Sequence, residues 1–422
     1  MNLLRTTLDN GLKVLIRESH AAPVVSVWVW YRVGVRNEHQ GITGISHWVE
    51  HMAFKGSARW PEGKADQAVA REGGMYNGMT WNDFTTYYAT LPAHKISLAL
   101  DIEADRMRNI IFDPEAVESE RTVIISERQG NENSPLFLLG EEVQAVAYRV
   151  HPYGHETVGH LCDLQTMTRD MLYNHYQTYY TPNNAVLAIA GDFNAGEIER
   201  LSERYFGNIP AGPDAPPVTA VEPPQRGERR VVVEGAGQTD YLTVAYHIPE
   251  ARHEDFFALT ILNAILAGAS GFLVSSANIT NHTSRLYQAL VAKEFAVDID
   301  GSLSATVDPG LYHLTATAWP GRALIDLETA LNIEIERLQD TPVTPAELEK
   351  AQRQARALFA YASESTTNQA FWLGYSEIFA DYGWFLRYVD KLAAVTVEDV
   401  QRVAQTYLRP QNRTVGWYLT PK

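Results

Sequence analysis

The second half of the chain repeats part of the first half at a constant offset in residue number. A segment that begins at Thr168 and another that begins at Thr396 share Thr, Gln, Thr, Tyr, Pro and Asn at identical spacing, with an offset of 396 − 168 = 228. A run that reads as a strand follows each segment. Solenoid repeats recur after roughly 20–50 residues, so a period this long predicts two similar domains instead.

A proline-rich segment separates the two copies. Residues 210–228 contain six prolines and two glycines, which is typical of an exposed, semi-rigid linker. We therefore expect one domain at residues 1–209 and a second at residues 229–422. The chain has 422 residues, of which 45% are hydrophobic, enough for a core in each domain. The expected class is α+β, with a mainly antiparallel sheet in each domain and helices packed on one face of it.

Two histidines and a glutamate fall on one side of a predicted helix. In the run His47-Trp48-Val49-Glu50-His51 the histidines are four positions apart, so both imidazoles project from one face. Two zinc ligands need this geometry. Glu50 is placed to hold a water beside such a metal and to take its proton as general base. The order H-x-x-E-H is the inverzincin pattern. An amphipathic helix that happens to carry two histidines is the alternative.

The third ligand of such a site must come from elsewhere, because catalytic zinc usually has three protein ligands and an open fourth position. Asp113-Pro114 is a favourable start for a second helix, with an Asx N-cap and a proline in the first turn. On that helix Glu120 and Glu127 are two turns apart and share a face. Acidic helix faces are usually just solvated, so these residues alone leave the third ligand open.

The arrangement as a whole resembles the M16 metallopeptidases, the relatives of pitrilysin, insulin-degrading enzyme and mitochondrial processing peptidase. Glu127 follows His51 at an offset of 127 − 51 = 76, and another glutamate stands two helical turns before it. Other segments also resemble sequences of this family: Gly44–Gly56 around the motif, residues 73–80 and 83–88, and residues 151–154. The resemblance runs over nearly the whole chain.

The resemblance implies a role for each of these residues. His47, His51 and Glu127 would bind one Zn2+ per chain, and Glu50 would be the catalytic base. Glu120 would orient a histidine or tune the metal from outside its ligand shell. The two domains would face each other across a central cavity that encloses the substrate.

Residues 75–80 and 84–91 read as two adjacent strands. In the M16 pattern the first of them is an edge strand that pairs with an extended substrate, and Asn77, Gly78 and Met79 would be substrate contacts. Main-chain pairing of this kind accepts many peptide sequences. A simple turn at Asn77-Gly78 is the alternative, and without the resemblance it would be preferred.

The two halves are not equivalent. The second half has an apolar helix at Phe257–Leu266 where the first half has its motif. Single-chain M16 enzymes carry an Arg/Tyr pair in the second half that helps to hold the substrate and the developing oxyanion. The position of the Arg is Val291 here, and the position of the Tyr is Val297 or a neighbour of Val297. One oxyanion donor is worth on the order of 100-fold in rate. We therefore expect a homologous partner chain that supplies the pair, in a heterodimer, with a homodimer as the alternative.

Charge and composition narrow the remaining choices. The formal net charge of −16 argues against nucleic acid or an anionic membrane as a partner. No apolar run approaches a membrane span, and the N-terminal residues lack a signal-peptide core, so we expect a cytoplasmic protein. The single cysteine, Cys162, suits a reducing compartment.

Two functions from different classes remain. The first is a zinc endopeptidase that hydrolyses peptides or unfolded polypeptide segments. The second is a non-catalytic M16-like subunit, either structural or peptide-binding. Chains of the second kind usually lose motif residues, and this chain retains His47, Glu50, His51 and Glu127. The sequence therefore favours the enzyme.

Overall fold

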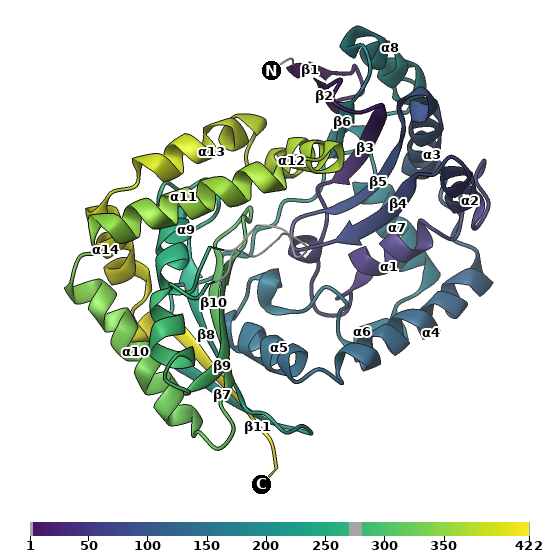
Figure 1. Ribbon diagram of the computed structural model, residues 1–422. Coiled ribbons are helices and arrows are strands. Elements are labelled where there is room, and N and C mark those ends of the chain that lie inside the picture. The colour runs from purple at the N-terminus through teal and green to yellow at the C-terminus, as the bar shows by residue number, and fades with distance from the viewer. Residues whose placement is uncertain (1–2, 270–280, 422) are drawn as a thin grey trace. The chain divides into compact units, whose positions relative to one another are not determined.

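The computed structural model describes residues 3–269 and 281–421, which form two compact units. Unit 1 consists of Met1–Gln129, His155–Ala220 and Ser363–Tyr382. Unit 2 consists of Gly130–Gly154, Val221–Ala362 and Gly383–Lys422. Each unit is therefore discontinuous in sequence. Figure 1 shows a sheet and its helices in each.

Unit 1 is built on a six-stranded sheet with the order β1-β2-β6-β3-β5-β4. Only the β2–β6 pair is parallel. The central strand β6 is apolar and buried along its whole length, while β4 lies at an edge. The strand bounds are β1 (Leu3–Thr7), β2 (Lys13–Glu18), β3 (Val24–Tyr31), β4 (Met75–Thr80), β5 (Thr85–Pro92) and β6 (Ala185–Gly191).

Helices cover both faces of this sheet. α3 packs on β3 and β5, and α8 packs on β2. On the opposite face Trp28 and Trp30 of β3 make ring contacts with Phe371 of α12. The helices of unit 1 are α1 (Ile45–Met52), α2 (Lys64–Arg71), α3 (Ile96–Asn109), most of α4 (Pro114–Asn131), α6 (Leu161–Thr166), α7 (Arg169–Tyr179), α8 (Ala195–Phe206) and α12 (Thr366–Phe379).

Unit 2 contains a five-stranded sheet with the order β7-β11-β8-β10-β9. Here the β7–β11 pair is the parallel one. The strands are β7 (Arg229–Glu234), β8 (Tyr241–Ile248), β9 (Ala296–Leu303), β10 (Gly310–Ala318) and β11 (Arg413–Leu419). The helices are α5 (Pro135–Ala147), α9 (Asp255–Leu266), α10 (Leu324–Asp340), α11 (Pro345–Ala362), α13 (Tyr382–Ala394) and α14 (Val397–Tyr407).

The sequence repeat corresponds to a repeated topology. β2-β6-β3-β5-β4 in unit 1 matches β7-β11-β8-β10-β9 in unit 2, with one parallel pair at the same place. β6 and β11 begin at Ala185 and Arg413, which gives the same offset as the sequence repeat (413 − 185 = 228). Thr168 and Thr396 cap α7 and α14, each accepting a hydrogen bond from the backbone N–H three positions later. The predicted α+β class with two similar sheets is confirmed. The expected placement of helices on one face does not hold for unit 1, because α12 covers the second face of its sheet.

The two halves of the sequence exchange one helix each. α5 comes from the first half but packs on β11, β7 and β8 of unit 2, whereas α12 comes from the second half and packs on β3 and β6 of unit 1. The chain passes from unit 1 to unit 2 between Ala220 and Val221, inside the predicted linker. The predicted division into residues 1–209 and 229–422 did not include this exchange of helices. In the described part of the chain we find no helix with the length and apolar character needed to cross a membrane.

Candidate metal centre and active site

His47 and His51 project together from α1. This helix starts after Gly44, whose φ of 85° lies in the left-handed region, and its buried residues include Trp48, Val49 and Met52. The four-residue spacing brings the imidazole rings to 4.5 Å between centroids. Their Nε2 atoms lie 3.2 Å apart. Two ring nitrogens at this distance are arranged to share one cation.

Glu127 of α4 completes a group of three. Its Oε1 lies 3.7 Å from Nε2 of His47, and its Oε2 lies 3.6 Å from Nε2 of His51. Zinc bonds of about 2.0–2.2 Å in tetrahedral geometry place neighbouring donor atoms roughly 3.4 Å apart. The observed separations fit such an ion. Among the described residues, His47, His51 and Glu127 form the group of side chains whose possible ligand atoms lie close enough together to hold a metal ion.

The electrostatic surroundings of the two histidines differ, and those of His51 favour a nearby cation. Burial and the neighbouring His51 lower the pKa of His47 to about 3, so its imidazole is neutral near pH 7. Burial also acts to lower the pKa of His51, but the hydrogen bond to Glu120 and the nearby carboxylates raise it overall. Carboxylates that favour positive charge at this ring also favour a cation bound beside it.

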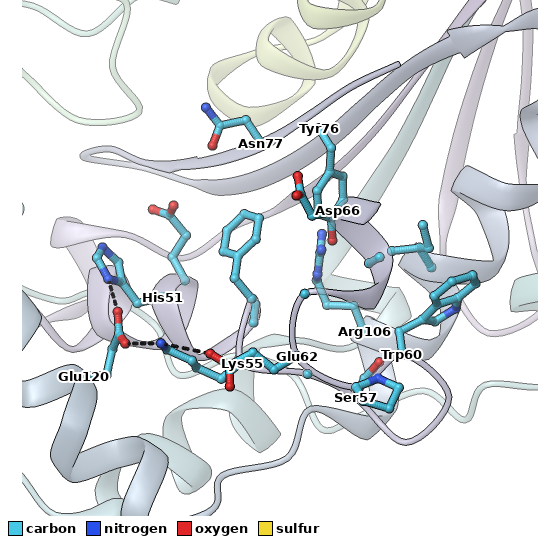
Figure 2. Close-up of a pocket in the computed structure, with 18 residues that line it drawn as sticks. His51, Lys55, Ser57, Trp60, Glu62, Asp66, Tyr76, Asn77, Arg106 and Glu120 are labelled. Carbon is cyan, nitrogen blue, oxygen red and sulfur yellow. Dashed lines mark hydrogen bonds and ion pairs between the residues drawn. The ribbon is translucent and has the colours of Figure 1, made fainter. Parts of the chain in front are cut away.

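Glu120 of α4 lies against the ring of His51 (Figure 2). Its Oε1 accepts a hydrogen bond from Nδ1 of His51 at 2.8 Å. With the proton on Nδ1, Nε2 of the same ring is the nitrogen that can bind a metal ion. Its Oε2 lies 2.7 Å from Nζ of Lys55. Burial acts to raise the pKa of Glu120, but these two hydrogen bonds lower it overall. The carboxyl group is thus kept ionised beside the proposed ligand.

Glu50 lies on α1 between the two histidines and faces strand β4. Its Oε2 accepts a 2.8 Å hydrogen bond from Oγ1 of Thr80. A Cβ atom at Gly78 would lie 3.2 Å from Oε1, so the missing side chain of Gly78 leaves room for this carboxylate. Burial raises the pKa of Glu50. A carboxylate with a raised pKa accepts a proton more readily than an ordinary exposed glutamate does.

The predicted substrate residues lie on β4, the free edge of the unit 1 sheet. Asn77 is exposed, and its own Oδ1 accepts a hydrogen bond from the backbone N–H of Gly78. Gly78 and Met79 are half-buried. The segment is a strand paired with β5 in the register Asn77↔Tyr88, so the alternative of a turn at Asn77-Gly78 is wrong.

A cavity of about 540 Å3 opens beside His51. Its lining includes Glu50, His51, Tyr76, Asn77 and Arg106. In Figure 2 His51 lies next to Glu120, and Tyr76 lies close to Arg106. The buried guanidinium of Arg106 lies 5.0 Å from the ring centre of Tyr76. The group of possible metal ligands therefore borders a space that can hold part of another molecule.

Thr80 and Lys55 contact the site but were not predicted from the sequence. Lys55 is four positions after His51, yet α1 ends at Met52, so helical spacing alone did not place it beside Glu120. Thr80 shares a strand face with Gly78, since alternate residues of a strand point the same way. That alternation, combined with the predicted strand, was the available signal for Thr80.

The positions expected for the Arg/Tyr pair lie in unit 2. Val291 ends the short helical segment Tyr287–Val291, and Val297 is half exposed on β9. The nearby Arg285 forms two hydrogen bonds with Glu347, at 2.9 and 3.1 Å. Val291 and Val297 therefore provide neither a positive charge nor a phenol hydroxyl, and Arg285 is paired with the carboxylate of Glu347.

Comparison with known families agrees with the fold. Residues 13–160 match the family described as "Insulinase (Peptidase family M16)". Residues 166–355 match the "Peptidase M16 inactive domain". Together the two matches span most of the chain, and the second match begins at residue 166, before the predicted linker.

Individual proteins show the same relationship. The chain is 28% identical over 420 residues to the zinc protease PqqE of Helicobacter pylori, covering 97% of this chain and 90% of that protein. It is 25% identical to the mitochondrial-processing peptidase subunit beta of Lentinula edodes, covering 96% and 87%. The crystal structure of a protease from Helicobacter pylori superposes with a TM-score of 0.93 at 27% identity, covering 100% and 99%. The chain therefore belongs to the M16 family of zinc peptidases.

Proposed function

We propose that the chain is the zinc-bearing subunit of an endopeptidase that hydrolyses peptides or unfolded polypeptide segments. The observation that carries this proposal is the convergence of His47, His51 and Glu127 at donor distances of 3.2, 3.6 and 3.7 Å, with Glu50 on the same helix as the histidines. A zinc ion held by these three side chains would polarise the scissile carbonyl and make nearby water more acidic.

Glu50 would act as the general base and then as the acid. Its carboxylate would take a proton from the attacking water and return it to the leaving amine. The hydrogen bond from Thr80 would fix one of its oxygens, so that the other oxygen receives the proton. Glu120 would hold the ring of His51 in place through Nδ1.

The substrate would bind as an extended strand along the edge of β4. Backbone groups at Asn77, Gly78 and Met79 would pair with the peptide main chain, which makes binding tolerant of sequence. The position of β4 at the sheet edge and the cavity beside it support this part of the proposal. Enclosure of the peptide in a chamber belongs to the same proposal and rests on membership of the family.

Full activity would require a homologous partner chain. Val291 and Val297 stand where related single-chain enzymes have their Arg/Tyr pair, and Arg285 is occupied by Glu347. A relative named as the beta subunit of mitochondrial-processing peptidase supports a two-subunit arrangement. The partner would supply the missing donors for the developing oxyanion.

The deciding experiment combines zinc analysis with a peptidase assay. Wild type, Glu50→Gln and the matched surface control Glu115→Gln are assayed on an unstructured, quenched-fluorescent peptide, and bound zinc per chain is measured. We expect wild type and Glu115→Gln to bind one zinc and Glu50→Gln to retain it. Activity should fall about 100-fold or more in Glu50→Gln alone. A chain without zinc and without activity would instead favour a structural or peptide-binding subunit.

The partner requirement has a separate test. The isolated chain is compared with its complex with a homologous chain that carries the Arg/Tyr pair. We expect the complex to cleave the peptide at least about 100-fold faster, because oxyanion donors act mainly in the transition state. Equal rates for the isolated chain and every complex would show that no partner is needed.

A further inference from the structure

A loop from the middle of the chain touches the start of the helix that carries the histidines. We call residues 155–163, which include the first turn of α6, the brace loop. Oδ2 of Asp163 accepts hydrogen bonds from the backbone N–H of Gly41 and of Thr43, both at 3.0 Å, and from Oγ1 of Thr43 at 2.7 Å. The same hydroxyl accepts a hydrogen bond from the backbone N–H of His160 at 2.8 Å. Thr43 is thus held from two sides, four positions before His47.

Two glycines let the backbones meet without any side chain between them. A Cβ at Gly44 would lie 2.4 Å from the carbonyl oxygen of Val158. A Cβ at Gly159 would lie 2.2 Å from the carbonyl oxygen of Thr43. Both glycines also have positive φ, 85° and 79°, which other residues rarely adopt. The separation between the brace loop and the start of α1 is therefore tightly fixed.

The brace loop also holds the helix that carries Glu127. Nη1 of Arg128 donates a hydrogen bond to the carbonyl oxygen of Gly159 at 2.7 Å. Arg128 directly follows Glu127 on α4, and it is 7% exposed. One residue, Gly159, consequently contacts both the start of α1 and the residue next to the third ligand.

Glu38 fixes the orientation of α1 at the same end. The N-cap of this helix is Gly44, which has no side chain to satisfy the first backbone N–H groups. The carboxylate of Glu38 accepts hydrogen bonds from Gly44 N at 2.8 Å and Ser46 N at 2.9 Å. Nε2 of His155, the first residue of the brace loop, lies 3.6 Å from this carboxylate. The loop therefore packs against the group that caps the helix.

We propose that the brace loop is a positioning element that sets the distance between the His47/His51 pair and Glu127, through Thr43 on one side and Arg128 on the other. The inference rests on the proposed zinc role of these three residues. α1 and α4 are separate helices, so their ligand atoms converge only if something holds the helices in register. None of the brace residues belongs to the ligand group itself.

The test uses two variants with a matched control. Arg128→Met removes the donor to Gly159 but keeps an apolar stem, and Thr43→Val removes the bridging hydroxyl at constant shape. Arg169→Met is the control, because Arg169 also donates to a backbone carbonyl of unit 1, that of Phe112 at 3.1 Å, away from the site. Arg128→Lys tests rescue by a shorter donor.

Zinc affinity is measured by competition with a chelator, and the visible spectrum of the Co2+-substituted chain reports the geometry of the ligands. The thermal stability of the metal-free chain is measured in parallel. We expect Arg128→Met and Thr43→Val to weaken zinc binding about tenfold and to alter the cobalt spectrum. Arg128→Lys should recover part of the affinity, and Arg169→Met should leave both readouts at the wild-type level.

Two outcomes would overturn the inference in distinguishable ways. If wild type binds zinc but Arg128→Met and Thr43→Val match Arg169→Met in affinity and spectrum, the loop is only a structural support and the inference fails alone. If wild type binds neither zinc nor cobalt, the proposed function fails and the inference falls with it.

Discussion

At the scale of single residues, His47 and His51 have different surroundings although they lie one turn apart. Nδ1 of His51 donates to Glu120, whose other oxygen pairs with Lys55. Nδ1 of His47 is buried, and the described residues provide no hydrogen-bond partner for it. The orientation of the metal site should therefore depend more strongly on the group behind His51.

This asymmetry predicts the effect of Glu120→Gln. The amide retains an acceptor but removes the negative charge that favours a cation beside His51, so zinc affinity should fall about 10–100-fold. Chelator competition measures the change. Glu118→Gln is the control, because Glu118 lies on the same helix with its side chain 66% exposed. Equal affinities in the two variants would show that Glu120 does not tune the site.

Some residues of the site could be predicted from the sequence pattern alone, and others could not. His47, Glu50 and His51 lie on one short helix, where spacing alone predicts a shared face. Glu127 approaches from a separate helix, and only the resemblance to a family indicated it. The geometry brings these groups together, while their catalytic roles stay predictions. Thr80 was not predicted, because strand alternation places it on the same face as Gly78 but does not identify it as a hydrogen-bond partner of Glu50.

At the scale of secondary-structure elements, α12 packs unusually closely on the sheet of unit 1. A Cβ at Gly374 would lie 2.0 Å from Nε1 of Trp30, whose side chain is fully buried. Gly374→Ala should therefore displace the helix or the indole and lower the free energy of unfolding by about 1–3 kcal/mol. Denaturant titration measures this loss.

Gly140 of α5 is the matched control for Gly374. It lies within the other exchanged helix, but a Cβ there would meet no atom within 4 Å. Gly140→Ala should raise the free energy of unfolding by roughly 0.5–1 kcal/mol, because alanine has the higher helix propensity. The same sign of change in both variants would contradict the close contact at Trp30.

The first turn of α11 predicts a pH effect. Thr344 and Glu347 form a capping box, in which Glu347 N donates to Oγ1 of Thr344 and the carboxylate accepts from Thr344 N. Partial burial acts to raise the pKa of Glu347, but the hydrogen bonds from Arg285 and Thr344 lower it to about 2. Stability from this group is full above its unfolded pKa of about 4.5 and is lost as the pH falls towards 2.

Glu347→Gln should flatten this part of the acid unfolding curve. Allowing for screening by solvent at this partly exposed group, wild type should lose on the order of 2 kcal/mol more than the variant between about pH 5 and pH 2. Glu349→Gln is the control, because Glu349 lies on the same helix in an exposed ion pair. Parallel curves for wild type and Glu347→Gln would show that the bonds to Arg285 and Thr344 contribute no net stability.

At the scale of the whole molecule, the exchange of α5 and α12 ties the two halves of the sequence together. A break between Pro216 and Pro217, which are exposed, would leave α5 on the first fragment and α12 on the second. Each fragment would still have a helix packed in the unit formed mainly by the other. The halves of the sequence are therefore not independent domains.

A protease site inserted between these prolines tests the point. After cleavage both fragments should elute together at the mass of the intact chain in native buffer and separate only in denaturant. Uncut protein carrying the same insertion is the control. Separation of the fragments in native buffer would mean that the exchanged helices contribute little to stability.

The exchange also marks what the sequence did not reveal. The internal repeat predicts that β6 and β11 are equivalent, and both were expected as strands. The sequences of α5 and α12 are apolar, and α12 is buried on every side from Ala370 to Phe379. Such a pattern predicts burial, but it contains no information on which sheet covers the helix. The packing partner depends on the path of the chain outside the helix, so two continuous domains were the simplest expectation.

The separation in sequence between α12 and its sheet matters while the protein is being made. The sheet of unit 1 is complete once β6 ends at Gly191, but α12 begins only at Thr366, much later in the chain (366 − 191 = 175). At translation rates of about 5–20 residues per second, roughly 10–35 s pass before this helix emerges from the ribosome. During that interval the face with Trp28 and Trp30 lacks the cover that α12 gives it in the complete chain. Newly made chains should accordingly depend on chaperones that shield this face until synthesis is nearly finished.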